Sequence, residues 1–379
     1  SGCTARCLRL RARMGTVDEK AHTSDSACLA RLEMELAEHI GRKRCFCCAS
    51  GTDAMTLALL TREVRTGDAV FVPTLASSSM VDAVVLRGAS PVFVDVGSSL
   101  VLDVPRLAEA ICRVRREGWL RPVGVVGVDL FGVPVDNALV ELADQEGLWF
   151  LEDIGLSLGA SRGGRNAGSL GMLSVCSLLP EGTSGCLYDG GAVFVDDIAL
   201  SGYLDALCQR ERVGMRDSRL LGICSRLDGL AACALLESVT DLPQEVAHRC
   251  ELSEIYRSAL PSALLRPIIP PDVMPSWPRY VVRLPDRMTR DRLRLFLSTK
   301  GIPAVPPSVG PLHLDPAFSG LGPGRGAFPY SEVTGPTLLQ LPMHTFLTTR
   351  QVHQVCDAVS EFFDSSIHRG DTLTAHPSF

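Results

Sequence analysis

Short apolar runs alternate with helix-like stretches along the first half of the chain, and this alternation limits the fold more than any other feature. The apolar runs are Cys45–Ala49, Ala69–Val72, Pro91–Val96, Val123–Leu130, Trp149–Leu151, Leu173–Leu179 and Ala192–Val195. Stretches with apolar residues at helical spacing lie between them, at Asp53–Leu60, Met80–Leu86, Val104–Arg115 and Asn137–Glu146. This alternation predicts an α/β fold, in which a mostly parallel central sheet is flanked by helices.

The second half of the chain has a different pattern. A helical region covers about 198–262, and a proline-rich stretch follows at 263–277. One strand, one helix, a loop rich in glycine and proline, and a last helix come next, at Tyr280–Leu284, Arg290–Lys300, 301–329 and Thr349–Phe363. This order predicts a smaller C-terminal α+β domain. We therefore expect a loose N-terminal arm at 1–27, a large domain at 28–245, a small domain at 246–364 and a mobile tail at 365–379.

Charge and hydropathy narrow the choice of partners. The chain has 379 residues and a formal net charge of -6, whereas surfaces that bind nucleic acid are usually basic, so we expect no nucleic-acid partner. No apolar run reaches the roughly 18 residues that a membrane-spanning helix needs, and 1–30 lacks the apolar segment of a signal peptide. These observations predict a cytoplasmic protein without membrane contact.

The chain contains 14 cysteines, but their spacing does not form a disulfide framework. Several of them, such as Cys45, Cys47 and Cys176, lie inside apolar runs. In a reducing compartment such residues act as small buried hydrophobes, so we expect structural free thiols. Cys45, Cys47 and Cys48 lack a second Cys or His pair at zinc-site spacing, and we therefore expect no metal site.

The segment Ala49–Met55 joins a predicted strand to a predicted helix and contains Gly51 and Thr52. Glycine lets the backbone approach a ligand closely, and the free N–H groups at a helix start favour an anion. One interpretation is therefore a phosphate site at Gly51 and Thr52. The other is a helix cap made by Ser50 or Thr52.

Two further strand ends carry polar residues. Asp153 follows a buried strand, where the ligands of open α/β sheets gather, so it could pair with a protonated ring nitrogen. Ser177 begins a polar, glycine-rich loop that extends to Gly191, and its hydroxyl could donate to a phosphate. The alternatives are a capping role for Asp153 and an ordinary turn-rich loop after Ser177.

Taken together, these segments resemble the DegT/DnrJ family of nucleotide-sugar aminotransferases over about 28–363. Supporting stretches are Gly67–Pro73, Gly88–Val96, Gly168–Gly171, Asp189–Ala192, Gly301–Pro303, Pro311–Leu314 and Leu341–Pro342. The resemblance implies a fold-type-I aminotransferase architecture and a homodimer that builds its site from two chains. It also implies pyridoxal phosphate as cofactor and a place in the biosynthesis of amino sugars for polysaccharides and antibiotics.

The lysine that the family requires is missing. The family's lysine amine forms an imine with the cofactor aldehyde and then moves the substrate proton. The corresponding position is Gly182, in the stretch Ser177–Gly185. A shift in alignment does not supply the amine, because no lysine lies between Lys43 and Lys300. Arginine cannot replace it, since a guanidinium stays protonated.

Other positions that contact the cofactor in the family also differ. The family's aromatic residue that stacks on the ring corresponds to Ser77, and a polar residue near the ring hydroxyl corresponds to Leu156. The asparagine that reaches the phosphate of the partner subunit corresponds to Cys224. Positions that keep the family's residue type are Gly51, Thr52, Asp153, Ser177 and His313. They could hold a phosphate and a ring nitrogen, or they could persist for the fold.

These departures favour a homologue that is not an active aminotransferase and has a binding or partner role, either as a homodimer or beside an active relative. The ligand would be a nucleotide sugar, and any pyridoxal or pyridoxamine phosphate would bind without a covalent bond. One alternative is an aminotransferase or dehydratase with a base other than lysine, such as Glu181. Another is an unrelated activity in a rebuilt pocket, with Ser77, Glu181, Cys186, Cys224 and His313 as candidate lining residues.

Overall fold

The computed structural model describes residues 21–178, 189–208, 223 and 225–368. Its largest element is a seven-stranded sheet with the order β1-β10-β9-β6-β5-β2-β4. Strand β10 is antiparallel to both of its neighbours, whereas the pairs from β9 to β4 are all parallel. The strands are β1 (Arg44–Cys48), β2 (Asp68–Pro73), β4 (Ser90–Val94), β5 (Arg121–Val128), β6 (Trp149–Asp153), β9 (Leu173–Ser177) and β10 (Gly191–Val195). The prediction of a mostly parallel sheet is confirmed.

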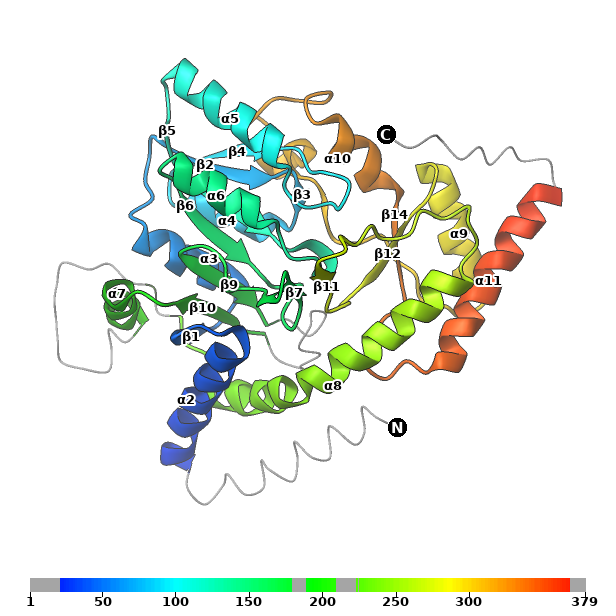
Figure 1. The fold of residues 1–379 in the computed structure, drawn as a ribbon, viewed down its shortest axis with the longest axis horizontal. Helices are drawn as coiled ribbons and strands as arrows, with labels where there is room; N and C mark the ends of the chain where they lie inside the picture. The colour runs from blue at the N-terminus through cyan, green and yellow to red at the C-terminus, as the bar shows by residue number, and fades with distance from the viewer. Residues whose placement is uncertain (1–20, 179–188, 209–222, 224, 369–379) are drawn as a thin grey trace.

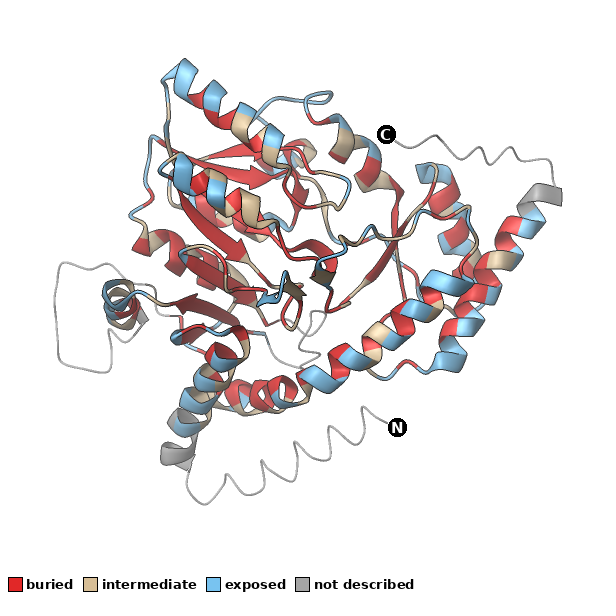
Figure 2. Ribbon diagram, viewed as in Figure 1, coloured by how far each residue is buried: buried red, intermediate tan, exposed pale blue. Residues whose placement is uncertain are grey.

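Helices cover both faces of this sheet (Figure 1). Strand β2 shows the reason, because Val70 and Val72 pack in one apolar cluster while Ala69 and Phe71 pack in another. Both faces of the strand are therefore buried, and its sequence is a continuous apolar run. The covering helices are α2 (Ala21–Ile40), α3 (Gly51–Thr61), α4 (Ser78–Leu86), α5 (Val104–Glu117), α6 (Asn137–Gln145) and α7 (Ile198–Cys208). Figure 2 shows the strands in the buried colour and the outer sides of these helices exposed.

A smaller α+β unit follows in the sequence. Its antiparallel pair β12–β14 packs with helices α9, α11 and the end of α8 around a separate apolar cluster that includes Tyr256, Tyr280 and Val359. The elements are α8 (Gly229–Ala259), β12 (Tyr280–Arg283), α9 (Arg287–Thr299), α10 (Pro329–Thr334), β14 (Leu338–Leu341) and α11 (Thr349–His368). Two short sheets complete the fold. One pairs β3 (Leu75–Ala76) with β13 (Gly310–Pro311), and the other has three strands in the order β11-β7-β8, with β7 at Ser161–Arg162, β8 at Arg165–Asn166 and β11 at Val273–Met274.

The ends of several elements differ from the sequence expectation. Helix α2 begins at Ala21, inside the segment 1–27 that was expected to be a loose arm. Helix α11 continues to His368, beyond the expected start of a mobile tail at 365. Helix α8 runs through the proposed boundary between 28–245 and 246–364, so the two parts share one helix. Helix α10, which begins at Pro329, and strand β14, which ends directly before Pro342, were not expected, because each is short.

The structure contains a disulfide, although the cysteine spacing gave no disulfide framework. Cys28 on α2 is bonded to Cys233 on α8, and the sequence separation of 205 residues explains why no spacing pattern revealed the pair. Cys45, Cys47 and Cys176 are buried free thiols, as expected. Within the described ranges, no helix is long and apolar enough to cross a membrane.

Candidate functional site

The start of helix α3 lies directly against the end of strand β9. A methyl group added at Gly51 would lie 2.6 Å from both Cβ and Oγ of Ser177 and 3.1 Å from its Cα. No side chain fits between the two segments, so glycine is required for this approach. Two of the residues predicted to bind phosphate are therefore neighbours, beside the free N–H groups of a helix N-terminus.

Ser50, rather than Thr52, caps helix α3. The Ser50 hydroxyl accepts a hydrogen bond from the N–H of Asp53 at 3.1 Å. The carbonyl of Thr52 accepts from the Thr56 hydroxyl, while the Thr52 hydroxyl has no hydrogen bond with any described residue. Of the two capping candidates, Ser50 has the structural role, and the half-buried Thr52 hydroxyl remains available to a ligand.

Ser225 joins the same helix start, although sequence reasoning did not identify it. Its buried hydroxyl donates to Oδ2 of Asp53 at 2.7 Å and accepts from the N–H of Ala49 at 3.0 Å. Ser225 directly follows Cys224, which corresponds to the family's phosphate-contacting asparagine, so the alignment already indicated this segment of the chain. Because serine is common in loops, the residue type of Ser225 did not predict a contact with the start of α3.

Asp153 ends strand β6 and lies beside Ser177. Its Oδ1 accepts the N–H of Gly155 at 3.0 Å, and a methyl group at Gly155 would lie 3.3 Å from both Asp153 Oδ1 and Ser177 Cβ. Burial raises the pKa of Asp153 to about 6, because the charged carboxylate loses hydration. Gly51, Asp153 and Ser177 thus form one group at the carboxyl ends of the strands, which we call the strand-end site.

Buried acids lie next to the strand-end site. Oε2 of Glu152 accepts the N–H of Leu170 at 3.0 Å, and burial raises the pKa of Glu152 to about 7. Asp129 accepts from Ser157 at 2.6 Å and from Val135 at 2.9 Å, and burial together with the charge of Glu152 raises its pKa. These bonds fix the ends of strands β5 and β6, and therefore the position of Asp153.

The other candidate lining residues are scattered or lie outside the described part of the chain. Ser77 is exposed at the start of α4, with its hydroxyl 3.2 Å from that of Ser79. Leu156 is half-buried in the loop after β6 and packs against the main apolar cluster. The positions Glu181, Gly182, Cys186 and Cys224 lie outside the described residues.

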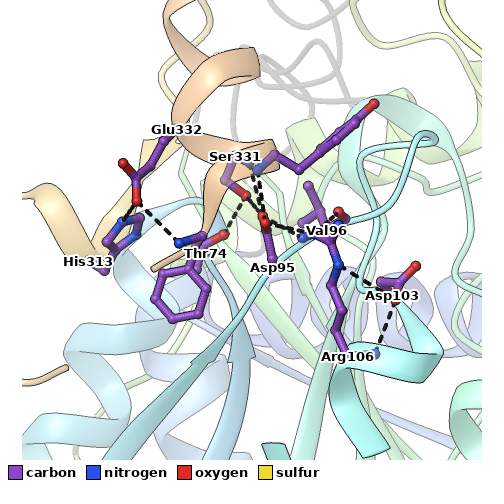
Figure 3. Close-up of polar contacts among 10 residues, drawn as sticks. Thr74, Asp95, Val96, Asp103, Arg106, His313, Ser331 and Glu332 are labelled. Atoms are coloured by element: carbon purple, nitrogen blue, oxygen red, sulfur yellow. Dashed lines mark hydrogen bonds and ion pairs between the residues drawn. The ribbon is translucent and has the colours of Figure 1, made fainter. Parts of the chain in front are cut away.

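His313 belongs to a different cluster. Its ring is fully buried, with Nε2 3.1 Å from Oε1 of Glu332 and with the ring of Phe328 at a centroid distance of 4.6 Å. Figure 3 shows it against Glu332 of α10, the helix whose Ser331 contacts Thr74 and Asp95. Glu332 and Phe328 thus enclose the ring, its buried Nδ1 has no hydrogen-bond partner among the described residues, and a pocket role for His313 stays a prediction.

The two described lysines, Lys43 and Lys300, lie on parts of the fold other than the strand-end site. Lys43 is exposed and precedes β1, at the amino end of that strand, where its backbone N–H donates to Asp196. Lys300 ends α9 and pairs with Glu361 of α11 at 2.7 Å. Within the part of the chain that the structure describes, neither amine belongs to the strand-end site.

The chain has the architecture of a fold-type-I aminotransferase: a seven-stranded, mostly parallel sheet, a smaller α+β unit, and the strand-end site at the carboxyl ends of the strands. Comparison with known proteins then identifies the family. The sequence profile of the DegT/DnrJ/EryC1/StrS aminotransferase family matches residues 12–360, and the chain belongs to this family.

Relatives agree with this assignment. The chain is 33% identical to a dTDP-3-amino-3,4,6-trideoxy-alpha-D-glucose transaminase from Streptomyces venezuelae, covering 83% of this chain and 81% of the relative. It is 28% identical to the UDP-2-acetamido-2-deoxy-3-oxo-D-glucuronate aminotransferase of Pseudomonas aeruginosa, covering 88% and 90%. A family member from Brucella abortus has a crystal structure that superposes with a TM-score of 0.88 at 33% identity, covering 94% of this chain and 95% of that one.

Proposed function

We propose that this chain is a catalytically silent member of the aminotransferase family that binds a phosphate-bearing ligand without forming an imine. One observation carries the proposal: the sequence has no lysine between Lys43 and Lys300. The positions of Lys43 and Lys300 support it, because both lie on other parts of the fold. Without an unprotonated amine at the strand ends, the imine of the family reaction cannot form.

The remaining groups fit the non-covalent part of the family's cofactor. The contact between Gly51 and Ser177 leaves backbone N–H groups and a hydroxyl for a phosphate, and Asp153 supplies a carboxylate for a protonated ring nitrogen. The covalent part does not fit, since Gly182 carries no side chain that could react. Binding of pyridoxal or pyridoxamine phosphate, or of a nucleotide sugar, is the function that these groups support.

The alternative is an enzyme that uses another base. A pyridoxamine-phosphate-dependent dehydration of a keto-sugar nucleotide needs no resting imine, and Glu181 or a residue of a second subunit would have to move the proton. Turnover of a keto-sugar nucleotide in the presence of pyridoxamine phosphate would establish this alternative and exclude the silent-homologue proposal.

Membership of a family that builds its site from two chains also supports a dimer. We propose a homodimer in the cytoplasm, or a heterodimer with an active relative, in amino-sugar or polysaccharide biosynthesis. Sedimentation velocity of the chain alone, and again after mixing with an active family member, distinguishes these states. A monomer in both samples contradicts the proposal.

Covalent binding is tested by incubating the chain with pyridoxal phosphate, reducing with borohydride and locating any adduct by mass spectrometry. We expect no lysine adduct at the strand ends and no imine absorbance after gel filtration. The matched variant Gly182→Lys should gain the imine band, because it returns an amine to the family position. A stable imine in the unaltered chain would overturn the proposal.

Non-covalent binding is tested by titrating the chain with pyridoxamine phosphate and following ligand fluorescence. Asp153→Asn should weaken binding about tenfold or more, because a charge-assisted contact to the ring nitrogen is lost. Asp144→Asn, an exposed change on α6, is the control and should leave the affinity unchanged. Equal affinity in the unaltered and Asp153→Asn proteins would show that the ligand does not use this site.

A further inference from the structure

A cavity lies between the sheet domain and the small domain. Leu100 and Phe131, which follow strands β4 and β5, form one side of it, and Trp277, Val281 and Tyr330 come from the C-terminal part. It has a volume of about 130 Å³, and none of the strand-end site residues lines it. We call this cavity the interdomain pocket. It is close in size to engineered cavities of about 150 Å³ that hold one benzene ring.

The charged groups of the interdomain pocket are all of one sign. Arg266, Arg279 and Arg283 line it, and no aspartate or glutamate does. Arg266 donates one bond to the carbonyl of Leu260, while its buried Nε has no hydrogen-bond partner. Arg283 has no ion pair within the described residues, and its guanidinium lies 5.9 Å from the centre of the Tyr330 ring. A half-buried guanidinium without a counter-charge favours an anionic ligand.

The backbone conformation around the pocket is independent evidence for a ligand site. Leu100, Phe131 and Trp277 have left-handed φ values of 66°, 56° and 49°, and the structure gives such values to only one other described residue that is not glycine, Glu63. For side chains of this size the left-handed region is sterically unfavourable. Strained residues of this kind concentrate at ligand-binding sites, and here they surround the same cavity.

From the size, the charge and the aromatic walls, we infer that the interdomain pocket binds a small organic acid with a carboxylate and an apolar body of about one ring. The carboxylate faces Arg266 and Arg283, since planar guanidinium groups match planar carboxylates. The apolar body packs against Phe131 and Trp277. This inference does not depend on the proposed function, because the pocket shares no residue with the strand-end site. Ser276, next to Trp277, contacts the carbonyl of Leu156 at 3.5 Å, so the two regions are adjacent.

The test is calorimetric titration of the full chain with benzoate as the probe, with benzamide as a neutral analogue of equal shape and with inorganic phosphate. We expect benzoate to bind, benzamide to bind at least tenfold more weakly because it lacks the charge, and phosphate not to compete because it lacks the apolar body. Phosphate that competes at the same concentration as benzoate would overturn the inference of an apolar body. Failure of benzoate to bind would overturn the site itself.

Variants locate the probe. Arg283→Gln and Arg266→Gln should each weaken benzoate binding about tenfold or more, and Arg283→Lys should weaken it less. The control is Arg287→Gln, an exposed arginine at the start of α9, which should have no effect. Circular dichroism verifies that each variant is folded. Ser177→Ala should leave benzoate binding unchanged, and a loss in that variant would place the probe in the strand-end site and contradict the inference.

Discussion

At the scale of single residues, the strand-end site depends on small side chains more than on reactive ones. Gly51 and Gly155 allow a helix start and a loop to reach Ser177, and Asp153 is held by one backbone N–H. The functional groups could be anticipated because they follow buried strands. The contact of His313 with Glu332 could not be anticipated, since the segment Pro311–Leu314 fixes the position of the residue but says nothing about the direction of its ring.

The substitution Gly51→Ala should destabilise the protein by about 1–3 kcal/mol, because its methyl group would overlap Ser177. The midpoint of urea unfolding measures the change. Gly202→Ala on helix α7 is the control, since no atom outside its own helical surroundings lies within 4 Å of the added methyl group. The control should be neutral or stabilising by up to about 1 kcal/mol. Equal midpoints for the two variants would contradict the close contact.

At the scale of elements, polar contacts attach the C-terminal part to the sheet. Asp95, after β4, accepts hydrogen bonds from the backbone N–H groups of Tyr330 at 3.0 Å and of Ser331 at 2.9 Å, and it pairs with Arg106 at 2.7 Å (Figure 3). Helix α10 has only six residues, and these bonds from a distant strand hold its first turn. Such an element depends on tertiary contacts, and its own sequence therefore did not predict it.

Asp95→Ala should cost about 2–4 kcal/mol, since it leaves buried donors and the Arg106 guanidinium without their carboxylate. We also expect faster proteolysis in the exposed segment 319–327, because α10 anchors its end. Urea unfolding and the rate of cleavage at that segment are the two measurements. Asp144→Ala on α6 serves as the control, and an equal cleavage rate in both variants would argue against the anchoring role.

The disulfide attaches helix α2 to helix α8 across a separation of 205 residues. Its loss should lower the free energy of unfolding by about 2–5 kcal/mol, because the unfolded chain gains freedom. The variant Cys28→Ser and treatment of the unaltered chain with a reductant should lower the urea midpoint by similar amounts. Cys112→Ser, which removes an exposed free thiol, should not change it. A reductant effect that persists in Cys28→Ser would assign the stabilisation to another pair.

At the scale of the whole molecule, the large sheet was predictable and the way in which its parts join was not. Strands such as Ala69–Val72 are buried on both faces, so they appear as apolar runs, and the structure extends that run by only a residue at each end. The pairing of Leu338–Leu341 with β12 gave no such signal, since proline lies close to both ends of this short strand. The contacts that join distant segments have no local pattern.

The buried acids should make the stability of the whole molecule depend on pH. Burial raises the pKa of Glu152 to about 7 and of Asp153 to about 6, so the folded state binds these protons more tightly than the unfolded chain. The free energy of unfolding should therefore increase by on the order of 4 kcal/mol as the pH falls from about 8 to about 5. The gain ends near pH 4, where the carboxyls of the unfolded chain are protonated too.

Thermal unfolding across this pH range measures the effect. Glu152→Gln should flatten the dependence, because the amide has no proton to gain and can still accept the N–H of Leu170. Asp144→Asn should leave the slope unchanged. A slope that is the same in Glu152→Gln and in the unaltered chain would show that Glu152 does not contribute.

Helix α8 has a practical consequence for dividing the chain. Its first half, including Leu235 and Leu242, packs with the sheet domain, and its second half, including Leu252 and Tyr256, packs with the small domain. A cut near residue 245 would therefore leave each fragment with an unprotected helix end and an apolar face without its partner. The two lobes are best expressed as one polypeptide, and a fragment for biophysical work should retain the whole of Gly229–Ala259.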